Sequence, residues 1–272
     1  MLKIYDNLEK YKNGEKIYGD DFTIDQIEEW FRDESEAYCE IVPEQHRDTY
    51  DEYKLQTEVL LYRYINKNSL SLLSYGGGYG TEIIPIIDKV KEVTILEPGS
   101  KFVRDEIKGK KVKYIVPEPS GKMHFRNGEF DCITCLGVLH HIPNVTYIIS
   151  EFSRVLKDDG IILIREPISS MNLFSGQRNG LTPHERGLPL NKFKQIICDN
   201  GLTIKKQTLY DFGPLWKIKS LLKIKENKFY LCIDILLSKL FLWNYSYDSK
   251  NYFKKFRPNS VAFVLCKKKY NK

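Results

Sequence analysis

The chain lacks the long apolar segments that would attach it to a membrane or direct its export. No uncharged apolar run of roughly 18 or more residues occurs, so no membrane-spanning helix is predicted. The first residues, 1–6, also lack the apolar stretch of a signal peptide. Internal repeats and low-complexity segments are absent as well. We therefore expect a globular protein of the cytoplasm.

Cysteine is sparse, and its spacing excludes an ordinary zinc finger or ribbon. Among the six cysteines, Cys132 and Cys135 have the spacing of a metal or redox pair, but no second pair completes a zinc site. Both lie in an apolar segment, which favours buried thiols in a reducing compartment. Apart from the adjacent His140 and His141, the histidines and acids show no metal-ligand spacing. We expect no bound metal.

Length and charge narrow the function classes further. With 272 residues, 42% of them hydrophobic, the chain suits one α/β domain with additions. Residues 213–272 hold 14 Lys and Arg against three Asp and Glu, a net charge of +11, whereas the residues before them carry −5. This asymmetry suggests an anionic partner, such as a phosphorylated substrate, a lipid surface or a nucleic acid. A solvated, solubilising surface explains the same lysines equally well.

A glycine-rich turn at residues 76–80 is the most informative motif. The apolar run 70–74, typical of a buried parallel strand, leads directly into glycines at alternate positions. A second predicted strand, 92–96, ends at Glu97. Glycines let a ligand approach the backbone, and a carboxylate after the next strand can accept hydrogen bonds from ribose hydroxyls. The combination predicts a nucleoside-binding site.

Later segments place this turn in a family context. Residues 129–136 have the composition of a strand and continue into the loop Gly-Val-Leu-His-His-Ile-Pro at 137–143. Residues 151–160 follow as a predicted helix and turn, and 161–164 as a strand. Taken with the glycine turn, these segments resemble class I S-adenosylmethionine-dependent methyltransferases, in the branch that acts on small molecules.

The spacing of the glycines distinguishes two kinds of nucleotide-binding motif. A dinucleotide site requires G-x-G-x-x-G, whereas this chain has Gly76-x-Gly78-x-Gly80 followed by Thr81. The methyltransferase motif is an acid followed by G-x-G-x-G, and here Ser74 stands at the position of the acid. Serine keeps the hydrogen-bonding capacity but not the charge. The resemblance covers residues 70–212.

The resemblance implies S-adenosylmethionine as the cofactor and S-adenosylhomocysteine as its product. In the family, the glycine turn faces the methionine part, the acid after the second strand binds the ribose, and an acid after the third strand contacts the adenine. The cofactor-binding residues expected from this match are Ser74, Tyr75, Gly76, Gly77, Gly78, Tyr79, Glu97, Pro98, Glu118, Leu136 and Gly137.

The hydrophobic pattern predicts a doubly wound α/β fold of the class I methyltransferase type. Alternating strands and helices imply a mostly parallel, seven-stranded sheet with helices on both faces. The strands expected are 70–74, 92–96, 112–116, 130–136, 161–165, 203–209 and 260–267. The predicted divisions are an N-terminal helical cap (1–69, with helices near 23–31 and 45–66), a methyltransferase core (70–212 and 258–270) and an insertion (213–257).

Candidate catalytic residues follow from the chemistry of methyl transfer, since an attacking hydroxyl benefits from a general base. His141, His140 and Glu166 lie after predicted strands at the expected site and could serve. By family resemblance, a histidine in this loop is often a structural or cofactor-side residue rather than the base. A salt bridge is the alternative for Glu166. In the loop that follows, Arg178, His184 and Arg186 are candidate substrate-binding residues, with surface charge as the alternative.

The insertion at 213–257 interleaves aromatic and aliphatic residues with lysines. Leu236, Leu240 and Trp243 recur at helical spacing, which predicts one or two amphipathic helices. We favour a dimer face or a lid for this segment. The same composition also suits a helix that lies on a membrane surface.

The expected function is methyl transfer to a small molecule, at oxygen rather than nitrogen. A phosphorylated or nucleotide- or sugar-linked acceptor in bacterial glycan or metabolite biosynthesis fits the basic residues. One alternative is a peripheral-membrane methyltransferase with a lipid-linked acceptor. Another is a non-catalytic binding protein of the same fold, which Ser74 motivates. A nucleic-acid substrate is not expected, because neither a D/N-P-P-Y string nor an RNA-binding appendage is present.

Overall fold

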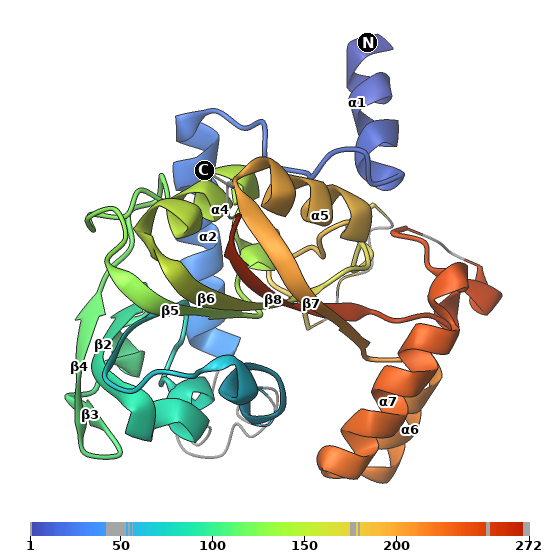
Figure 1. Cartoon of the computed structure of the whole chain (residues 1–272). Coiled ribbons are helices and arrows are strands. Elements are labelled where there is room, and N and C mark those ends of the chain that lie inside the picture. Colours follow the sequence, from blue (N-terminus) through green and yellow to red (C-terminus); the bar gives the residue numbers. More distant parts are fainter. Residues whose placement is uncertain are drawn as a thin grey trace.

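A single eight-stranded sheet forms the centre of the computed structural model, which describes residues 2–41, 53, 55, 57–174, 178, 180–248 and 251–268 (Figure 1). The strand order is β3-β4-β2-β1-β5-β6-β8-β7. The strands are β1 (Leu70–Tyr75), β2 (Val90–Leu96), β3 (Glu106–Ile107), β4 (Lys110–Ile115), β5 (Phe130–Leu136), β6 (Leu156–Pro167), β7 (Leu202–Tyr210) and β8 (Ser260–Lys267).

The central strands run parallel, and their two faces are covered by different helices. Strands β4, β2, β1, β5 and β6 are parallel neighbours, whereas β8 is antiparallel to both β6 and β7. Side chains of β1 alternate between two cores: Leu73 packs with α4 and α5, and Leu72 packs with the segment after the glycine turn. Burial on both faces explains why β1 and β5 are nearly continuous apolar runs.

The helices frame the sheet as the alternating pattern predicts. The α-helices are α1 (Leu2–Lys12), α2 (Ile24–Ile41), α4 (Val145–Val155), α5 (Leu190–Asp199), α6 (Gly213–Leu222) and α7 (Lys228–Leu240). Shorter helical segments are a π-helical turn, Thr57–Leu61, and 3₁₀ segments at Tyr62–Tyr64, Thr81–Lys89, Ser100–Phe102, Leu139–His141, Leu242–Asn244 and Tyr252–Lys255.

The predicted α/β class and all seven expected strands are confirmed, and the differences have local causes. The additional strand, β3, is two residues long and pairs only with β4, too short to leave a periodic signal. The segment after the glycine turn is a 3₁₀ helix with Pro85 inside it. Of the helix expected over 45–66, residues 45–52, 54 and 56 lie outside the described residues, and the described part includes the π-helical turn Thr57–Leu61 and the 3₁₀ turn Tyr62–Tyr64.

The insertion between β7 and β8 forms a helical hairpin beyond the edge of the sheet. Helices α6 and α7 lie side by side and extend away from β7 (Figure 1). The spacing of apolar residues predicts one or two helices here, and the structure has two. Within the described part of the chain, no helix combines the length and apolarity needed to cross a membrane.

Candidate active site

A narrow cavity opens where β1, β2 and β5 end. Its volume is about 90 Å³, whereas a nucleoside-sized ligand requires roughly 300 Å³ or more. Phe31, Glu34 and Ser35 of α2 form one wall of this cavity. The residues expected to bind the cofactor that do line this cavity are Tyr75, Gly76, Glu97, Pro98, Glu118 and Gly137.

The glycine turn is shaped for close approach. Gly76 has φ +65°, and a Cβ there would lie 2.4 Å from Val138 Cγ1, so a side chain is excluded by both strain and space. Its N–H donates to Leu96 O at 2.7 Å, which ties the turn to the end of β2. The N–H of Gly78 donates to Glu97 Oε2 at 2.9 Å. The turn and the acid therefore form one unit.

Glu97 is a buried carboxyl group whose oxygens can accept further hydrogen bonds. It accepts hydrogen bonds from Gly78 and, at 3.0 Å, from the N–H of Gly99. Burial raises the pKa of Glu97 to about 7, although these two hydrogen bonds act in the opposite direction. Two carboxylate oxygens can accept about four hydrogen bonds. The remaining capacity, at the cavity wall, fits the two hydroxyls of a ribose.

Ser74 and the remaining predicted residues lie off the cavity. Ser74 Oγ is hydrogen-bonded to Glu82, a buried carboxyl whose pKa burial raises to about 7. Glu82 thus brings a carboxyl group to the position next to Ser74, and the sequence analysis did not identify it. Other expected cofactor residues that do not line the cavity are Gly77, Gly78, Tyr79 and Leu136.

Glu118 differs from the other predicted cofactor residues because it is solvent-exposed. It lines the mouth of the cavity and forms an ion pair with His124. The hydrogen bond from His124 lowers the pKa of Glu118. An ionised acid at this place can still contact a ligand that enters the mouth.

Glu166 holds the turn that carries the two histidines. Its side chain is buried, and its oxygens accept from the N–H groups of Val138 (3.0 Å), Leu139 (2.8 Å) and His140 (3.2 Å). It also contacts His140 Nδ1 at 2.8 Å. These contacts engage the lone pairs of Glu166, and its side chain does not line the cavity. Its role is therefore to position this turn. The prediction that it acts as a base or contacts the substrate is wrong.

The two histidines differ in charge state. Burial lowers the pKa of His140, but hydrogen bonds and charges from Glu166 and Glu185 outweigh burial and raise it overall. Burial and the charge of His140 lower the pKa of His141, despite a hydrogen bond at 2.6 Å between its Nδ1 and Glu34. The pKa of His140 therefore lies above that of His141, so His140 is the more readily protonated ring and His141 the ring that favours the neutral form.

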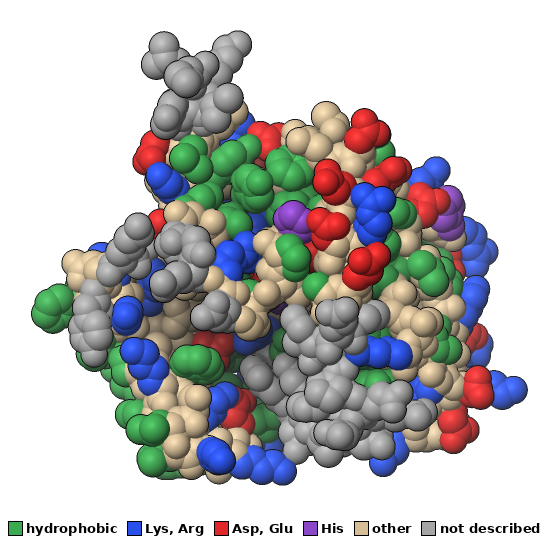
Figure 2. Space-filling view, turned by 180° about the vertical axis from the view of Figure 1, so that it is seen from behind, with side chains coloured by type: hydrophobic (Ala, Val, Ile, Leu, Met, Phe, Trp, Pro, Cys, Tyr) green, Lys and Arg blue, Asp and Glu red, His purple; other side chains and the backbone are tan. Residues whose placement is uncertain are grey.

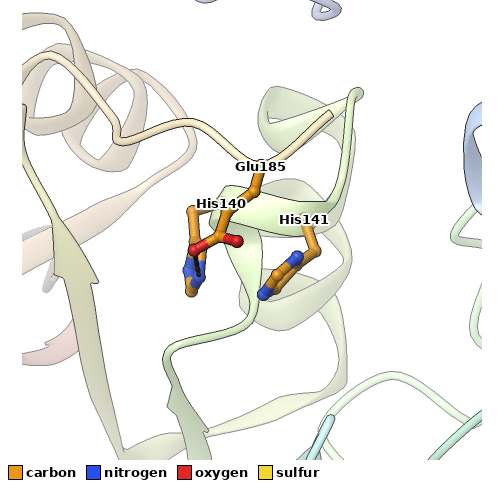
Figure 3. A group of neighbouring side chains, drawn as sticks. All are labelled: His140, His141 and Glu185. Atoms are coloured by element: carbon orange, nitrogen blue, oxygen red, sulfur yellow. Dashed lines mark ion pairs between the residues drawn. The ribbon is translucent and has the colours of Figure 1, made fainter. Parts of the chain in front are cut away.

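His140, His141 and Glu185 form a cluster of possible metal ligands, in which the side chain of Glu185 points from its loop toward the histidine pair (Figure 3). His140, His141 and Glu185 each offer a ligand atom within 4.8 Å of the others. His140, however, lies between two carboxylates, Glu166 at Nδ1 and Glu185 at 3.5 Å from Nε2. In its protonated form the ring donates to both carboxylates and has no lone pair for a metal. The expectation of no bound metal stays a prediction.

Arg186, predicted to bind substrate, is instead a buried clamp. Its guanidinium donates to Tyr18 O (2.7 Å) through Nε and to four carbonyls of the histidine turn through its terminal nitrogens. All five N–H donors are thereby used. The prediction is wrong because no donor remains for a substrate, and the surface-charge alternative is wrong because the side chain is buried.

Arg178 and His184 also hold the loop in place. Arg178 donates to Pro183 O at 2.8 Å and to Glu185 O. The His184 ring stacks on Trp30 of α2, with centroids 4.6 Å apart, and contacts Asp33 at 2.9 Å through Nε2. Neither residue lines the two cavities described. The structure therefore places both in loop anchoring, away from a substrate.

Replacing Arg186 by lysine should destabilise the fold. An ammonium cannot reach five carbonyls in a planar fan, so several buried acceptors lose their partner. We expect the free energy of unfolding to fall by about 3 kcal/mol, which lowers Tm by roughly 6–12 °C for a chain of this size. Thermal unfolding followed by circular dichroism measures this, with the exposed Arg126→Lys as the matched control. Equal Tm values for the two variants would contradict the clamp.

A second, wider cavity of about 720 Å³ lies beside His140. His141 lines the first cavity and His140 the second, so the histidine pair separates them. Tyr53 lines the second cavity, and a Cβ on Gly137 would lie 2.0 Å from its hydroxyl. Only glycine at 137 lets the Tyr53 hydroxyl reach this boundary. Charged residues in the wall are Arg165, Glu185, Asp211, Lys217, Lys255 and Arg257.

Comparisons with known proteins agree with this geometry. A family model described as a methyltransferase domain matches residues 46–195, more than half of the chain. A search of the curated proteins finds no match.

Solved structures share the fold at low identity. A chain of the Haloferax volcanii complex that contains the Trm112 methyltransferase activator aligns with TM-score 0.57 and 14% identity, covering 89% of this chain and 99% of that one. The [4+2]-cyclase SpnF aligns with TM-score 0.54 and 13% identity, covering 79% and 81%. Haemonchus contortus phosphoethanolamine N-methyltransferase 2, in complex with phosphomonomethylethanolamine and S-adenosylhomocysteine, aligns with TM-score 0.52 and 16% identity, covering 79% and 52%.

At such low sequence identity, these structural alignments show the fold alone. The activity follows from the family match. A cavity at the carboxyl ends of parallel strands, a glycine turn without room for side chains and a buried acid with spare acceptors fit an adenosyl cofactor. The chain therefore belongs to the methyltransferase domain family, as an enzyme of the class I, Rossmann-like type that uses S-adenosylmethionine.

Proposed function

We propose that the enzyme transfers a methyl group to a hydroxyl of a small acceptor that carries a phosphate, such as a nucleotide- or sugar-linked compound. The observation that carries this proposal is the cation-rich cavity beside His140, which meets the cofactor cavity at the histidine pair. An acceptor in the wide cavity would present its hydroxyl at that boundary.

The charges of the wide cavity favour an anionic ligand. Arg165, Lys217, Lys255 and Arg257 face two acids, a net of two positive charges. Arg165 is 2.7 Å from Asp211, which fixes its guanidinium in the wall. Burial lowers the pKa of Arg257, yet a guanidinium remains charged at any physiological pH. Partly desolvated guanidinium groups bind phosphate by paired, charge-assisted hydrogen bonds.

The chain's own residues would align the acceptor, exclude water and receive its proton. Bound S-adenosylmethionine supplies a methyl group on a positively charged sulfur, so an in-line displacement needs mainly orientation. The Tyr53 hydroxyl, at the boundary between the cavities, is placed to orient the acceptor hydroxyl. His141 is neutral and can take the proton as the oxygen–carbon bond forms.

Structural neighbours support this proposal only at the level of the fold. The Haemonchus protein binds a phosphorylated methyl acceptor, so a fold of this kind can accommodate one. The cyclase SpnF shares the fold as well, so the fold alone does not specify the acceptor.

Methyl transfer to matched acceptors tests the proposal. Hydroxyl compounds with and without a phosphate, sugar phosphates and free sugars among them, would be incubated with S-adenosylmethionine, and methylated products measured by mass spectrometry. We expect turnover of phosphorylated acceptors, and a KM for them that rises roughly tenfold or more in Arg257→Gln. Lys192→Gln, on α5 outside the cavity, is the control. Equal kcat/KM with and without the phosphate would overturn the phosphate requirement.

Cofactor binding should strengthen as the pH rises through about 7. Below that pH the Glu97 carboxyl is protonated, because its pKa is raised to about 7, and ribose hydroxyls donate more strongly to the ionised form. Binding then requires release of a proton, so affinity falls by up to about tenfold for each pH unit below 7.

Calorimetric titration at several pH values, in buffers of different ionisation enthalpy, measures both effects. Glu82 also has a pKa of about 7, so Glu82→Gln separates its contribution. An affinity that stays constant between pH 6 and pH 8 would contradict this role of Glu97.

A further inference from the structure

The hairpin of α6 and α7 exposes an unusual amount of apolar surface. Leu221 is 82% exposed, Phe229 74% and Trp243 77%. Single exposed apolar residues are ordinary, but a contiguous set marks a contact surface. We call this set the hairpin apolar face; it consists of Trp216, Ile218, Leu221, Leu222, Phe229, Ile233, Leu236, Leu240 and Trp243.

The spacing on α7 shows that this exposure is organised. Leu231, Asp234 and Ser238 are buried toward β7, and Asp234 accepts from the N–H groups of Asp211 (2.7 Å) and Phe212 (2.8 Å). That side anchors the hairpin to the sheet. The exposed apolar residues of α7 recur three or four positions apart, from Phe229 to Leu240, and form a separate stripe.

Lysines accompany the apolar residues. Lys217, Lys223, Lys225, Lys228 and Lys239 are exposed on the hairpin. Lys228 forms an ion pair with Glu58. Of the two acids within the hairpin, Asp234 is buried and Glu226 is paired with Lys219, so the hairpin keeps a net positive charge. Green apolar and blue basic side chains accordingly lie together at the lower left of Figure 2. The face is both apolar and positively charged.

These properties select one occupant. A second copy of the chain in a two-fold contact would bring two lysine-rich faces together, which is repulsive. An anionic lipid surface instead complements the lysines, accepts leucine and phenylalanine among its acyl chains, and favours tryptophan at the headgroup level. We propose that the α6–α7 hairpin docks the enzyme on an anionic membrane surface.

Docking would place the wide cavity near the lipid. Pro214, Trp216 and Lys217, in the first turns of α6, line that cavity. The hairpin therefore connects the proposed membrane contact with the acceptor site. The inference itself does not depend on which acceptor is used.

Co-sedimentation of the full chain with vesicles tests the proposal. Vesicles of phosphatidylcholine alone and with added phosphatidylglycerol would be compared at low and high salt. We expect binding to the anionic vesicles that weakens with salt. Lys223→Glu with Lys225→Glu should reduce this binding by roughly thirtyfold or more. The matched control is Lys111→Glu with Lys113→Glu, exposed lysines on β4 at the opposite side of the sheet.

A second pair of variants tests the apolar contribution. Leu221→Gln with Leu222→Gln should reduce vesicle binding by roughly tenfold or more, and the exposed Val103→Gln should not. Cofactor binding at parental affinity shows that each variant is folded. Absence of sedimentation with anionic vesicles at low salt would overturn the proposal. So would a stable dimer by light scattering that the leucine variant dissociates, because the occupant would then be a second copy.

Discussion

Glu97→Ala is expected to weaken binding of S-adenosylmethionine by roughly 10²- to 10⁴-fold. The carboxylate lies at the end of β2, where its oxygens accept from Gly78 at 2.9 Å and Gly99 at 3.0 Å and retain capacity toward the cavity. A hydrogen bond to a charged group contributes about 1.5–3 kcal/mol, and two ribose hydroxyls would each make one. Isothermal titration with the cofactor and with S-adenosylhomocysteine measures the loss.

Two further variants separate the ribose contact from a general disturbance. Glu97→Gln keeps an acceptor oxygen but loses the charge, so its affinity should fall between those of the parent and the alanine variant. Glu92→Ala removes an exposed acid from the same strand and should bind normally. If Glu97→Ala binds the cofactor as tightly as the parent does, the ribose assignment is wrong.

The central sheet could be predicted because its innermost strands, β1 and β5, are buried on both faces. Burial on both faces produces the short apolar runs that identify β1 and β5, and the runs end where glycines or polar residues begin. β3 left no such signal, since a two-residue edge strand has neither length nor periodicity. The type of the helix around Pro85 could not be predicted either, because its apolar residues suit several helix types.

The site could be predicted only where its residues follow strands in a fixed order. Gly76, Glu97 and His141 met that condition and lie around one cavity. Glu34 could not be found, because its contact with His141 joins residues 107 positions apart and depends on how α2 packs. The error at Arg186 has a related cause: five backbone carbonyls are its partners, and backbone groups leave no trace in the sequence.

The hairpin illustrates how exposure changes an interpretation. From the sequence alone, a dimer face or a lid was favoured for 213–257, because apolar residues at helical spacing usually become buried. The structure leaves that spacing exposed on α7, with lysines beside it. Exposure is a tertiary property, and it shifts the balance toward an anionic membrane surface, since like charges oppose self-association.

We propose that His141, whose lowered pKa favours the neutral ring, acts as the general base. Glu34 is ionised: burial raises its pKa, but hydrogen bonds from His141, Thr182 and His184 outweigh burial and lower it overall. An ionised carboxylate can only accept, so Nδ1 of His141, 2.6 Å away, carries the proton and Nε2 carries the lone pair. This arrangement, a carboxylate that orients a neutral imidazole beside a reaction site, is the usual preparation of a general base.

His141→Gln should therefore lower kcat for a hydroxyl acceptor by about 10²- to 10⁴-fold, the usual contribution of a general base. His184→Gln is the control, because that ring stacks on Trp30 outside both cavities. Because the pKa of His141 lies below its ordinary value of about 6.5, the parental kcat should be level at neutral pH and fall under more acidic conditions. Steady-state kinetics measured across this pH range distinguishes a role as general base from a role in shaping the cavity wall. An unchanged kcat in His141→Gln would mean that the acceptor attacks without a base, as a carboxylate does, and that His141 only shapes the cavity wall.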